Sequence, residues 1–236
     1  MRTNSRPLLI ANATRLADGA PLAVRVRAGV IRELADALAP EPGEWVIDAQ
    51  QGALLPGLHD HHLHLYALAA ARNSLACGPP DVRSAEDFAR VVRVHAAGAW
   101  GGHAWIRGVG YHETVAGPLD RWRLDALVPH RPLRIQHASG KAWFVNSLGL
   151  RALGIETATS DAGIERTPAG EATGRLFRMD DWLRTRLTDA DPPDLAGVST
   201  ELARHGATGV TDTSPANDAG TVRRLAEAQA RGAVCQ

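Results

Sequence analysis

The sequence predicts an α/β fold, in which a partial (β/α)₈ (TIM) barrel follows a small N-terminal β-sandwich segment. Residues 7–57 hold short apolar runs broken by turns, and from Leu58 onward such runs alternate with helical patterns, which is typical of a parallel sheet. Fewer residues follow Gly57 than the roughly 200 to 250 of a complete barrel. We therefore divide the chain into residues 1–57, the β-sandwich segment, and residues 58–236, the first half of a truncated barrel.

Turn residues and hydrophobic periodicity place the elements in order. In the first segment, Asp18-Gly19, Gly29 and residues 40–43 separate predicted strands at residues 8–13, 22–27, 30–34 and 45–48. In the second, strands are predicted at residues 58–64, 104–109, 133–137 and 208–213, and helices at residues 66–75, 85–99, 144–153, 180–187, 195–205 and 219–231. Residues 156–174, rich in Thr, Gly and Asp, are predicted to form a loop or an insertion, and long loops in compact domains tend to be functional. The first and last barrel strands would be open edges, so we expect a partner chain or a missing continuation to cover them.

Composition and charge narrow the functional classes. The chain has 26 basic and 26 acidic residues and a pI of about 7.2, so it lacks the excess positive charge of a nucleic-acid or anionic-membrane binder. No apolar run approaches the roughly 20 residues of a membrane span, and the first 20 residues lack the apolar region of a secretory signal. Cys77 and Cys235 form no C-x-x-C motif and indicate neither a disulfide framework nor a thiolate metal site. We expect a cytoplasmic globular protein that binds neither nucleic acid nor membranes.

Histidines are concentrated in one predicted strand. Four of the ten histidines lie within residues 59–64. Because side chains alternate along a strand, Asp60, His62 and His64 share one face, and His59 and His61 share the other. Active sites of barrel enzymes lie at the carboxyl ends of such strands. His62 and His64 therefore suit Zn²⁺ or a similar metal, and Asp60 would orient a ligand.

Further polar and aromatic residues lie near other predicted strand ends. Trp105, Tyr111 and His112 would suit a pocket with apolar walls and a few directed polar groups, with core packing as the alternative for Trp105. His137 ends the next strand, and it either faces the barrel mouth or is a hydrogen-bonded core histidine. Lys141, the single lysine, is a substrate-binding cation, a carbamylated metal bridge or an exposed loop residue.

Three acidic residues complete the candidates. Asp212 closes the last predicted strand, where it would bind a ligand or cap the following helix. Glu113 and Glu165 are isolated in predicted loops, and no pair of carboxylates has the spacing that glycosidase chemistry needs.

Several motifs resemble one enzyme family. The segment Pro56-Gly57-Leu58-His59-Asp60-His61-His62-Leu63-His64-Leu65 resembles the P-G-x-x-D-x-H-x-H-L signature that opens the barrel of the amidohydrolase superfamily. Residues 105–113, 136–143, 146–147, 173–177 and 209–212 resemble the amidohydrolase family 3 branch, so the resemblance covers nearly the whole chain.

This resemblance implies a metal-dependent hydrolase of amide-like, non-peptide C–N bonds with a small-molecule substrate. Family members use one or two divalent ions, for which Zn²⁺ is expected, to polarise the substrate carbonyl and to activate water. Only His62 and His64 carry over as ligands. The family's remaining ligands, two later histidines and an aspartate that shuttles the proton, would lie beyond Gln236, so no catalytic residue is assigned here. Lys141 stands where relatives have histidine.

Two functional hypotheses follow. In the first, the chain is the N-terminal fragment of an active amidohydrolase. In the second, it is an inactive remnant that binds metal weakly through His62 and His64, or that needs a second copy or a partner chain to complete the barrel. A nucleotide-binding function is disfavoured, because neither a G-x-G-x-x-G nor a P-loop motif is present.

Overall fold

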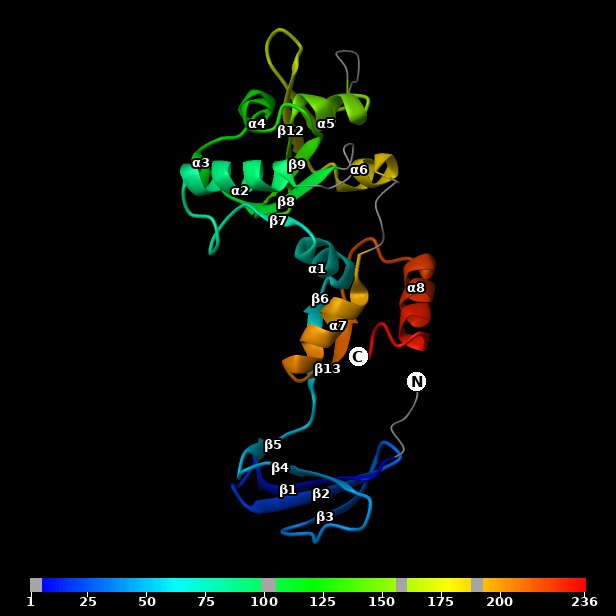
Figure 1. Ribbon diagram of the computed structural model, residues 1–236. Helices are drawn as coiled ribbons and strands as arrows, with labels where there is room; N and C mark the ends of the chain where they lie inside the picture. The colour runs from blue at the N-terminus through cyan, green and yellow to red at the C-terminus, as the bar shows by residue number, and fades with distance from the viewer. Residues whose placement is uncertain (1–5, 99–104, 156–160, 188–192) are drawn as a thin grey trace. The chain divides into compact units, whose positions relative to one another are not determined.

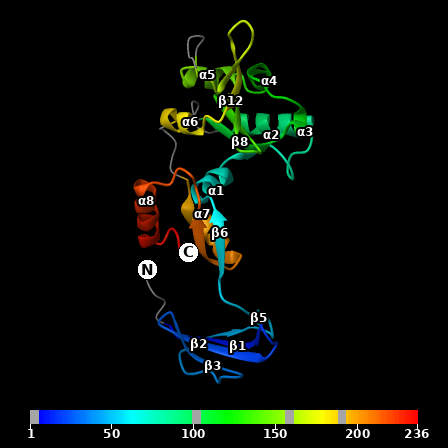
Figure 2. The ribbon, with the colours of Figure 1, turned by 180° about the vertical axis from the view of Figure 1, so that it is seen from behind.

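The computed structural model describes residues 6–98, 105–155, 161–187 and 193–236. The chain divides into two compact units (Figure 1; Figure 2 gives the reverse side). One unit combines Met1–Leu65 with Leu195–Gln236, and the other is the continuous stretch Tyr66–Asp194. The second unit is therefore an insertion in the sequence of the first.

The N-terminal part of the first unit is a five-stranded sheet. Its strands are β1 (Leu8–Arg15), β2 (Pro21–Arg27), β3 (Val30–Ala35), β4 (Trp45–Asp48) and β5 (Ala53–Leu54). The order is β3-β2-β1-β4, with β5 also paired to β1, and Leu9 and Val24 are buried. The four predicted strands are confirmed. In the described part of the chain, however, the predicted sandwich is a single sheet.

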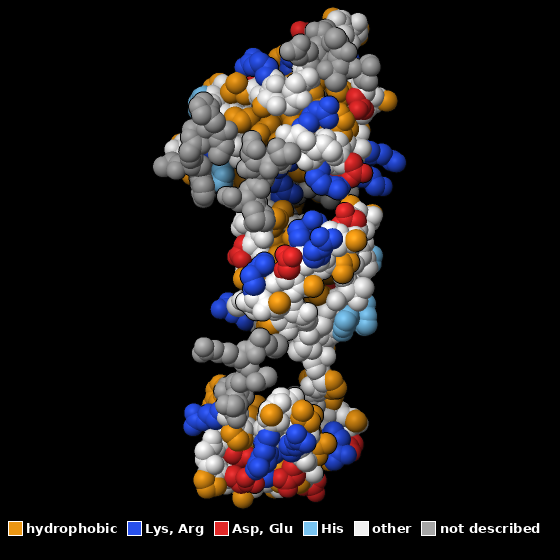
Figure 3. Space-filling view, turned by 90° about the vertical axis from the view of Figure 1, so that its right-hand side faces the viewer, with side chains coloured by type: hydrophobic (Ala, Val, Ile, Leu, Met, Phe, Trp, Pro, Cys, Tyr) orange, Lys and Arg blue, Asp and Glu red, His pale blue; other side chains and the backbone are white. Residues whose placement is uncertain are grey.

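Basic and acidic side chains gather over this sheet (Figure 3). Arg25, on β2, is only 5% exposed, and its Nε donates to Glu44 Oε1 at 2.6 Å. Its other guanidinium nitrogens donate to Glu33 and to the Ala39 carbonyl, and Glu41 lies 3.2 Å away. Because a buried charge is tolerated when it is paired and hydrogen-bonded, this network joins β2 to the segment before β4.

The first unit also contains two strands that pair in parallel, β6 (Leu58–Leu63) and β13 (Ala207–Asp212). Helix α7 (Leu195–Arg204) contacts β13, and helix α8 (Ala219–Ala230) follows β13 in the sequence. The Asp218 carboxylate accepts a hydrogen bond from the Thr221 N–H and so caps the start of α8.

The four predicted barrel strands do not share one sheet, which corrects the half-barrel prediction. β6 and β13 pair with each other in a sheet of two strands. The strands predicted at residues 104–109 and 133–137 are β8 (Ile106–Tyr111) and β9 (Leu133–His137), and they belong to a separate sheet of the inserted unit. Ala104 lies outside the described residues. The α/β class is confirmed, but no closed barrel is seen in the described ranges. Local periodicity identifies strands and does not indicate which strands pair, which is why the sheet was not predictable from it.

The inserted unit is built on a six-stranded mixed sheet. Its order is β11-β12-β10-β9-β8-β7, in which β7, β8 and β9 are parallel and the other pairs are antiparallel. The remaining bounds are β7 (Leu75–Ala76), β10 (Ala142–Val145), β11 (Ile164–Arg166) and β12 (Ala172–Phe177). Successive β10 residues join different cores: Phe144 packs with one cluster, and Trp143 and Val145 pack with another. The sheet therefore has an apolar core on each face.

The described part of the inserted unit also contains helices. They are α2 (Ala85–Ala97), α3 (Glu113–Ala116), α4 (Arg121–Leu127), α5 (Ser147–Ala152) and α6 (Asp180–Arg186), with α1 (Leu65–Arg72) spanning the boundary between the units. The side chains of Ser84, Asp120 and Asn146 each accept a backbone N–H three residues later, at the starts of α2, α4 and α5. No helix in the described ranges is both long and apolar enough to cross a membrane.

Several predicted elements need correction. The helix predicted at residues 144–153 is the buried strand β10 followed by α5, because an apolar run fits either element and Asn146 caps the helix only from residue 147. The loop predicted at residues 156–174 contains β11 and the start of β12, and its residues 156–160 lie outside the description. The predicted helix at residues 66–75 ends at Arg72, and the one at residues 85–99 ends at Ala97, before Gly98 and an undescribed residue 99.

Candidate functional site

The histidine-rich strand β6 presents His62 and His64 together. Their ring centroids lie 5.4 Å apart with the rings at 75°, and both residues are exposed. His59 and His61 form a second close pair, with centroids 4.4 Å apart, and His59 Nε2 lies 2.9 Å from Thr211 Oγ1. Figure 3 shows histidine side chains exposed on the part of the chain that holds β6 and β13. The strand has the alternation that its sequence predicts.

Short polar contacts fix the end of β6 against the end of β13. Asp60 Oδ1 accepts the His62 N–H at 2.9 Å, and Ser214 Oγ lies 3.3 Å from His64 Nδ1. Asp212 Oδ2 accepts the Leu65 N–H at 2.9 Å, and its Oδ1 accepts the Ser214 N–H at 2.8 Å. Asp212 therefore joins the two strand ends, whereas Asp218 caps α8. Burial raises the pKa of Asp212, but hydrogen bonds from Ser214, Asn217 and Leu65 outweigh it and lower the pKa overall, which keeps the carboxylate ionised.

The donor set of His62 and His64 fits a divalent metal. Two imidazoles on one face are borderline ligands of the kind that Zn²⁺ takes, and Ser214 holds Nδ1 of His64 as hydrogen-bonding partners commonly hold metal-bound histidines. Among the described residues, no third His, Cys or carboxylate joins this pair as a ligand group. Within the described residues this pair would thus provide two of the three protein ligands usual for a catalytic zinc.

Tyr111, predicted as a pocket residue, lies in the core. Its side chain is fully buried between Phe88 and Phe144, and its hydroxyl donates to the Gly117 carbonyl at 2.5 Å. The register of β8 shifts before Tyr111, where Gly110 adopts a φ of 78°, so the bulge turns Tyr111 inward. Burial raises the pKa of Tyr111 to about 12, so the phenol stays neutral at physiological pH.

Trp105 also packs against a core, which is the alternative to a pocket position that the sequence allows. It is partly buried beside the second apolar cluster of the inserted unit. The guanidinium carbon of Arg134 lies 5.8 Å from the Trp105 ring centroid and 5.2 Å from that of Trp143. Burial, followed by the charge of Arg107, lowers the pKa of Arg134 to about 10. These contacts describe cation–π packing in the inserted unit.

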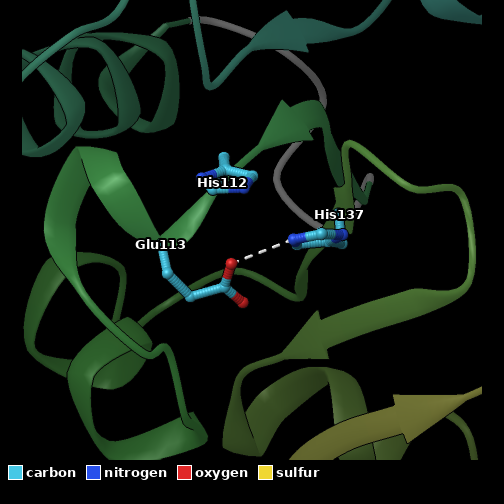
Figure 4. Close-up of side chains that lie close together, drawn as sticks. All are labelled: His112, Glu113 and His137. Atoms are coloured by element: carbon cyan, nitrogen blue, oxygen red, sulfur yellow. Dashed lines mark hydrogen bonds and ion pairs between the residues drawn. The ribbon is translucent and has the colours of Figure 1, made fainter.

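His112 and His137 come together with Glu113, an acid that the sequence pattern left isolated (Figure 4). His137 Nε2 lies 3.0 Å from Glu113 Oε2, and the two histidine ring centroids are 5.6 Å apart. Burial raises the pKa of Glu113, but hydrogen bonds from its own backbone N–H and from His137 reverse this and lower it. The sequence feature that could have indicated this cluster is the adjacency of His112 and Glu113 at the end of β8. His137 ends the neighbouring parallel strand, β9.

Lys141 lines a cavity next to this cluster. The cavity has a volume of about 340 Å³, and its walls include Glu113, His137 and the exposed Lys141. Glu165, on β11, also lines it, and its carboxylate accepts hydrogen bonds from Thr173 and Arg175. Glu165 is therefore part of a paired network, and Lys141 is placed where it could attract an anionic ligand.

The sequence profile of the amidohydrolase family matches residues 45–234. The chain belongs to the amidohydrolase family. It is similar to N-substituted formamide deformylase from Arthrobacter pascens, with 31% identity over 192 residues, covering 74% of this chain and 35% of that protein. It is also similar to Protein LONG AFTER FAR-RED 3 from Arabidopsis thaliana, with 26% identity, covering 72% of this chain and 30% of that protein.

Solved structures share the fold of this amidohydrolase chain. Two uncharacterised metal-dependent hydrolases, from Pyrococcus horikoshii and Pyrococcus furiosus, both match with a TM-score of 0.67, at 17% and 16% identity. The matches cover 97% and 98% of this chain but 47% and 48% of those chains. The chain thus spans about a third of the curated relatives and just under half of the solved structures that it matches.

Proposed function

We propose that this chain carries part of the active site of a metal-dependent hydrolase of amide-like, non-peptide C–N bonds. The observation that carries the proposal is the exposed pair His62 and His64 at the carboxyl end of β6, a strand paired in parallel with β13. The carboxyl ends of parallel strands are where barrel enzymes build their active sites. Membership of the amidohydrolase family and the 31% identity to an N-substituted formamide deformylase support the reaction class.

A divalent metal held by His62 and His64, for which Zn²⁺ is our first candidate, would polarise the substrate carbonyl and lower the pKa of a water molecule. Neighbouring residues of this chain hold the backbone of His62 and the ring of His64. Asp60 accepts the backbone N–H of His62, and Ser214 holds Nδ1 of His64 and leaves its Nε2 available. Because a catalytic zinc takes three protein ligands, we expect the other ligands from outside β6.

The metal site is tested first, by equilibrium dialysis of the chain against Zn²⁺. We expect His62→Ala and His64→Ala each to weaken binding at this site at least tenfold. His61→Ala is the matched control, because it removes a histidine of the same strand that pairs with His59 on the other side. Equal Zn²⁺ binding by wild type and the double variant His62→Ala/His64→Ala would contradict the proposed site.

The reaction is tested on N-substituted formamides, whose hydrolysis consumes one water and releases formate and an amine. Formate release that requires Zn²⁺ and is lost in His62→Ala would show that this chain forms the active site by itself. Zn²⁺ binding through His62 and His64 without turnover would instead favour the second hypothesis, in which the chain needs a second copy or a partner chain to complete the active site.

A further inference from the structure

We infer that His112, Glu113 and His137 form a second divalent-metal site, within the inserted unit and independent of His62 and His64. One potential ligand atom from each residue lies within 4.8 Å of the other two. In Figure 4 the Glu113 carboxylate points to the His137 ring, and the His112 ring lies beside both. Two imidazoles and one carboxylate are a ligand set for zinc or another first-row transition metal.

The backbone fixes the spacing of these three residues. His137 ends β9, and its register partner on the parallel strand β8 is Tyr111, the residue before His112. The Ala138 N–H donates to the Tyr111 carbonyl at 2.7 Å, which continues the strand pairing beyond His137. Glu113 opens the short helix α3 directly after His112. The ligands are therefore carried by two hydrogen-bonded strand ends, which are rigid supports for a metal site.

Each histidine has a hydroxyl partner two residues later. Thr114 Oγ1 lies 3.0 Å from His112 Nδ1, and Ser139 Oγ lies 2.7 Å from His137 Nδ1. A metal-bound histidine usually donates its second ring N–H to such a polar group, which fixes the tautomer and the ring orientation. If the hydroxyls accept from Nδ1, then Nε2 of each ring is free to bind a metal.

The same contacts describe the metal-free cluster in a different tautomer. The backbone N–H groups of Thr114 and Ser139 point to the same Nδ1 atoms, at 3.2 and 3.0 Å. With Nδ1 of His137 as acceptor, its Nε2–H donates to Glu113 Oε2. Metal binding at Nε2 therefore requires the His137 proton to move from Nε2 to Nδ1. The Nδ1–H then donates a hydrogen bond to Ser139 Oγ. This change distinguishes a metal site from a permanent Glu–His pair.

The neighbouring cavity gives such a metal access to a ligand. Glu113, His137 and Lys141 all line the cavity of about 340 Å³. Phe144 and Phe177 supply apolar walls. The coordination positions left by three protein ligands would therefore be open to water or to a small anionic ligand attracted by Lys141.

Calorimetric titration of the full chain with Zn²⁺ tests the inference in the double variant His62→Ala/His64→Ala, which removes the proposed hydrolase ligands. We expect one Zn²⁺ per chain to remain bound. Adding Glu113→Gln, which keeps the side-chain volume, or His137→Ala should weaken this binding at least tenfold. Ser139→Ala should weaken it about 10-fold to 100-fold, the range found for residues that orient metal ligands. His130→Ala is the matched control, since His130 is an exposed histidine of the same unit outside the cluster.

Nuclear magnetic resonance of ¹⁵N-labelled histidines supplies a second readout. We expect Zn²⁺ to move the His137 proton from Nε2 to Nδ1 in the double variant. No bound Zn²⁺ in a double variant with an unchanged circular dichroism spectrum, or binding that survives both Glu113→Gln and His137→Ala, would overturn the inference. Either result leaves the proposed hydrolase site intact, because that site is tested by His62 and His64 alone.

Discussion

Asn146 Oδ1 accepts a 2.9 Å hydrogen bond from the backbone N–H of Leu133, the first residue of β9. The same oxygen caps α5 through the Gly149 N–H, and Nδ2 donates to the carbonyls of Val128 and Arg131. Asn146 is 0% exposed, so one fully satisfied amide joins the end of α4, the start of β9 and the start of α5.

Replacing this amide should therefore destabilise the inserted unit. Asn146→Leu keeps the approximate volume but leaves four buried backbone groups without their partner, and we expect a loss of about 3–5 kcal/mol in the free energy of unfolding. Urea unfolding followed by circular dichroism measures it. Asn73→Leu, at an exposed position of the same unit, should change stability by about 0.5 kcal/mol or less. Equal losses in both variants would contradict the role of Asn146.

The two tyrosines should differ in their response to loss of the hydroxyl. Tyr111→Phe removes the buried hydrogen bond to the Gly117 carbonyl, and we expect it to cost about 1 kcal/mol of unfolding free energy. Tyr66→Phe is the control, because Tyr66 is only partly buried on α1. Thermal or urea unfolding compares the two. A Tyr111→Phe variant as stable as wild type would show that the hydroxyl contact contributes nothing.

The two cysteines should differ in reactivity. Burial raises the pKa of Cys77 to about 12, whereas Cys235 is exposed. Because the thiolate is the reactive form, iodoacetamide at pH 8 should modify one thiol per folded chain and two in urea. Mass spectrometry locates the label, and Cys235→Ser should abolish labelling of the folded chain. Modification of folded Cys77 would contradict its burial in the core.

Acid should weaken the N-terminal sheet through Glu44. A hydrogen bond from the Glu41 backbone and the contact with Arg25 lower the pKa of Glu44 below its ordinary value, despite the opposing effect of burial. A lowered pKa in the folded state gives stability that is present above the ordinary pKa and is lost as the pH falls through the lowered one. Hydrogen exchange of β1 and β2 should therefore be faster in Glu44→Gln than in wild type at pH 7, and the difference should shrink towards pH 3.

Glu86→Gln is the control for this pH dependence, since Glu86 lies on α2 in the other unit. It should leave the exchange of β1 and β2 unchanged at both pH values. A difference between Glu44→Gln and wild type that grows as the pH falls would have the wrong sign for a lowered pKa.

Local patterns predicted the histidine strand but not its partner. The faces of β6 follow from alternation within six residues, which is why the positions of His62 and His64 could be predicted. The pairing of Leu58 with Ala207 joins residues separated by the whole inserted unit, and no local periodicity reports such a contact. The local pattern likewise predicts β8 and β9 as strands, but it does not report that they pair with each other in a separate sheet.

The second cluster shows a related limit. Positions at strand ends predict His112 and His137 as site residues, whereas the sequence pattern leaves Glu113 isolated in a loop. Glu113 meets His137 because β8 and β9 are adjacent and parallel, which the local sequence does not indicate. Tyr111 was misplaced because a single extra residue at Gly110 reverses the inward and outward alternation, and a glycine in a strand pattern gives only a weak sign of such a bulge.

The insertion of residues 66–194 between two paired strands has a consequence for biosynthesis. A ribosome releases every residue of the inserted unit before it has made β13, so that unit can acquire its two apolar cores while β6 still lacks its neighbour. Closing so long a loop is slow compared with forming local contacts. Asp212, which holds the end of β6, is the last residue of β13, and Ser214, which contacts His64, follows it. The pair His62 and His64 therefore gains its hydrogen-bonding partners only after the whole inserted unit has been made.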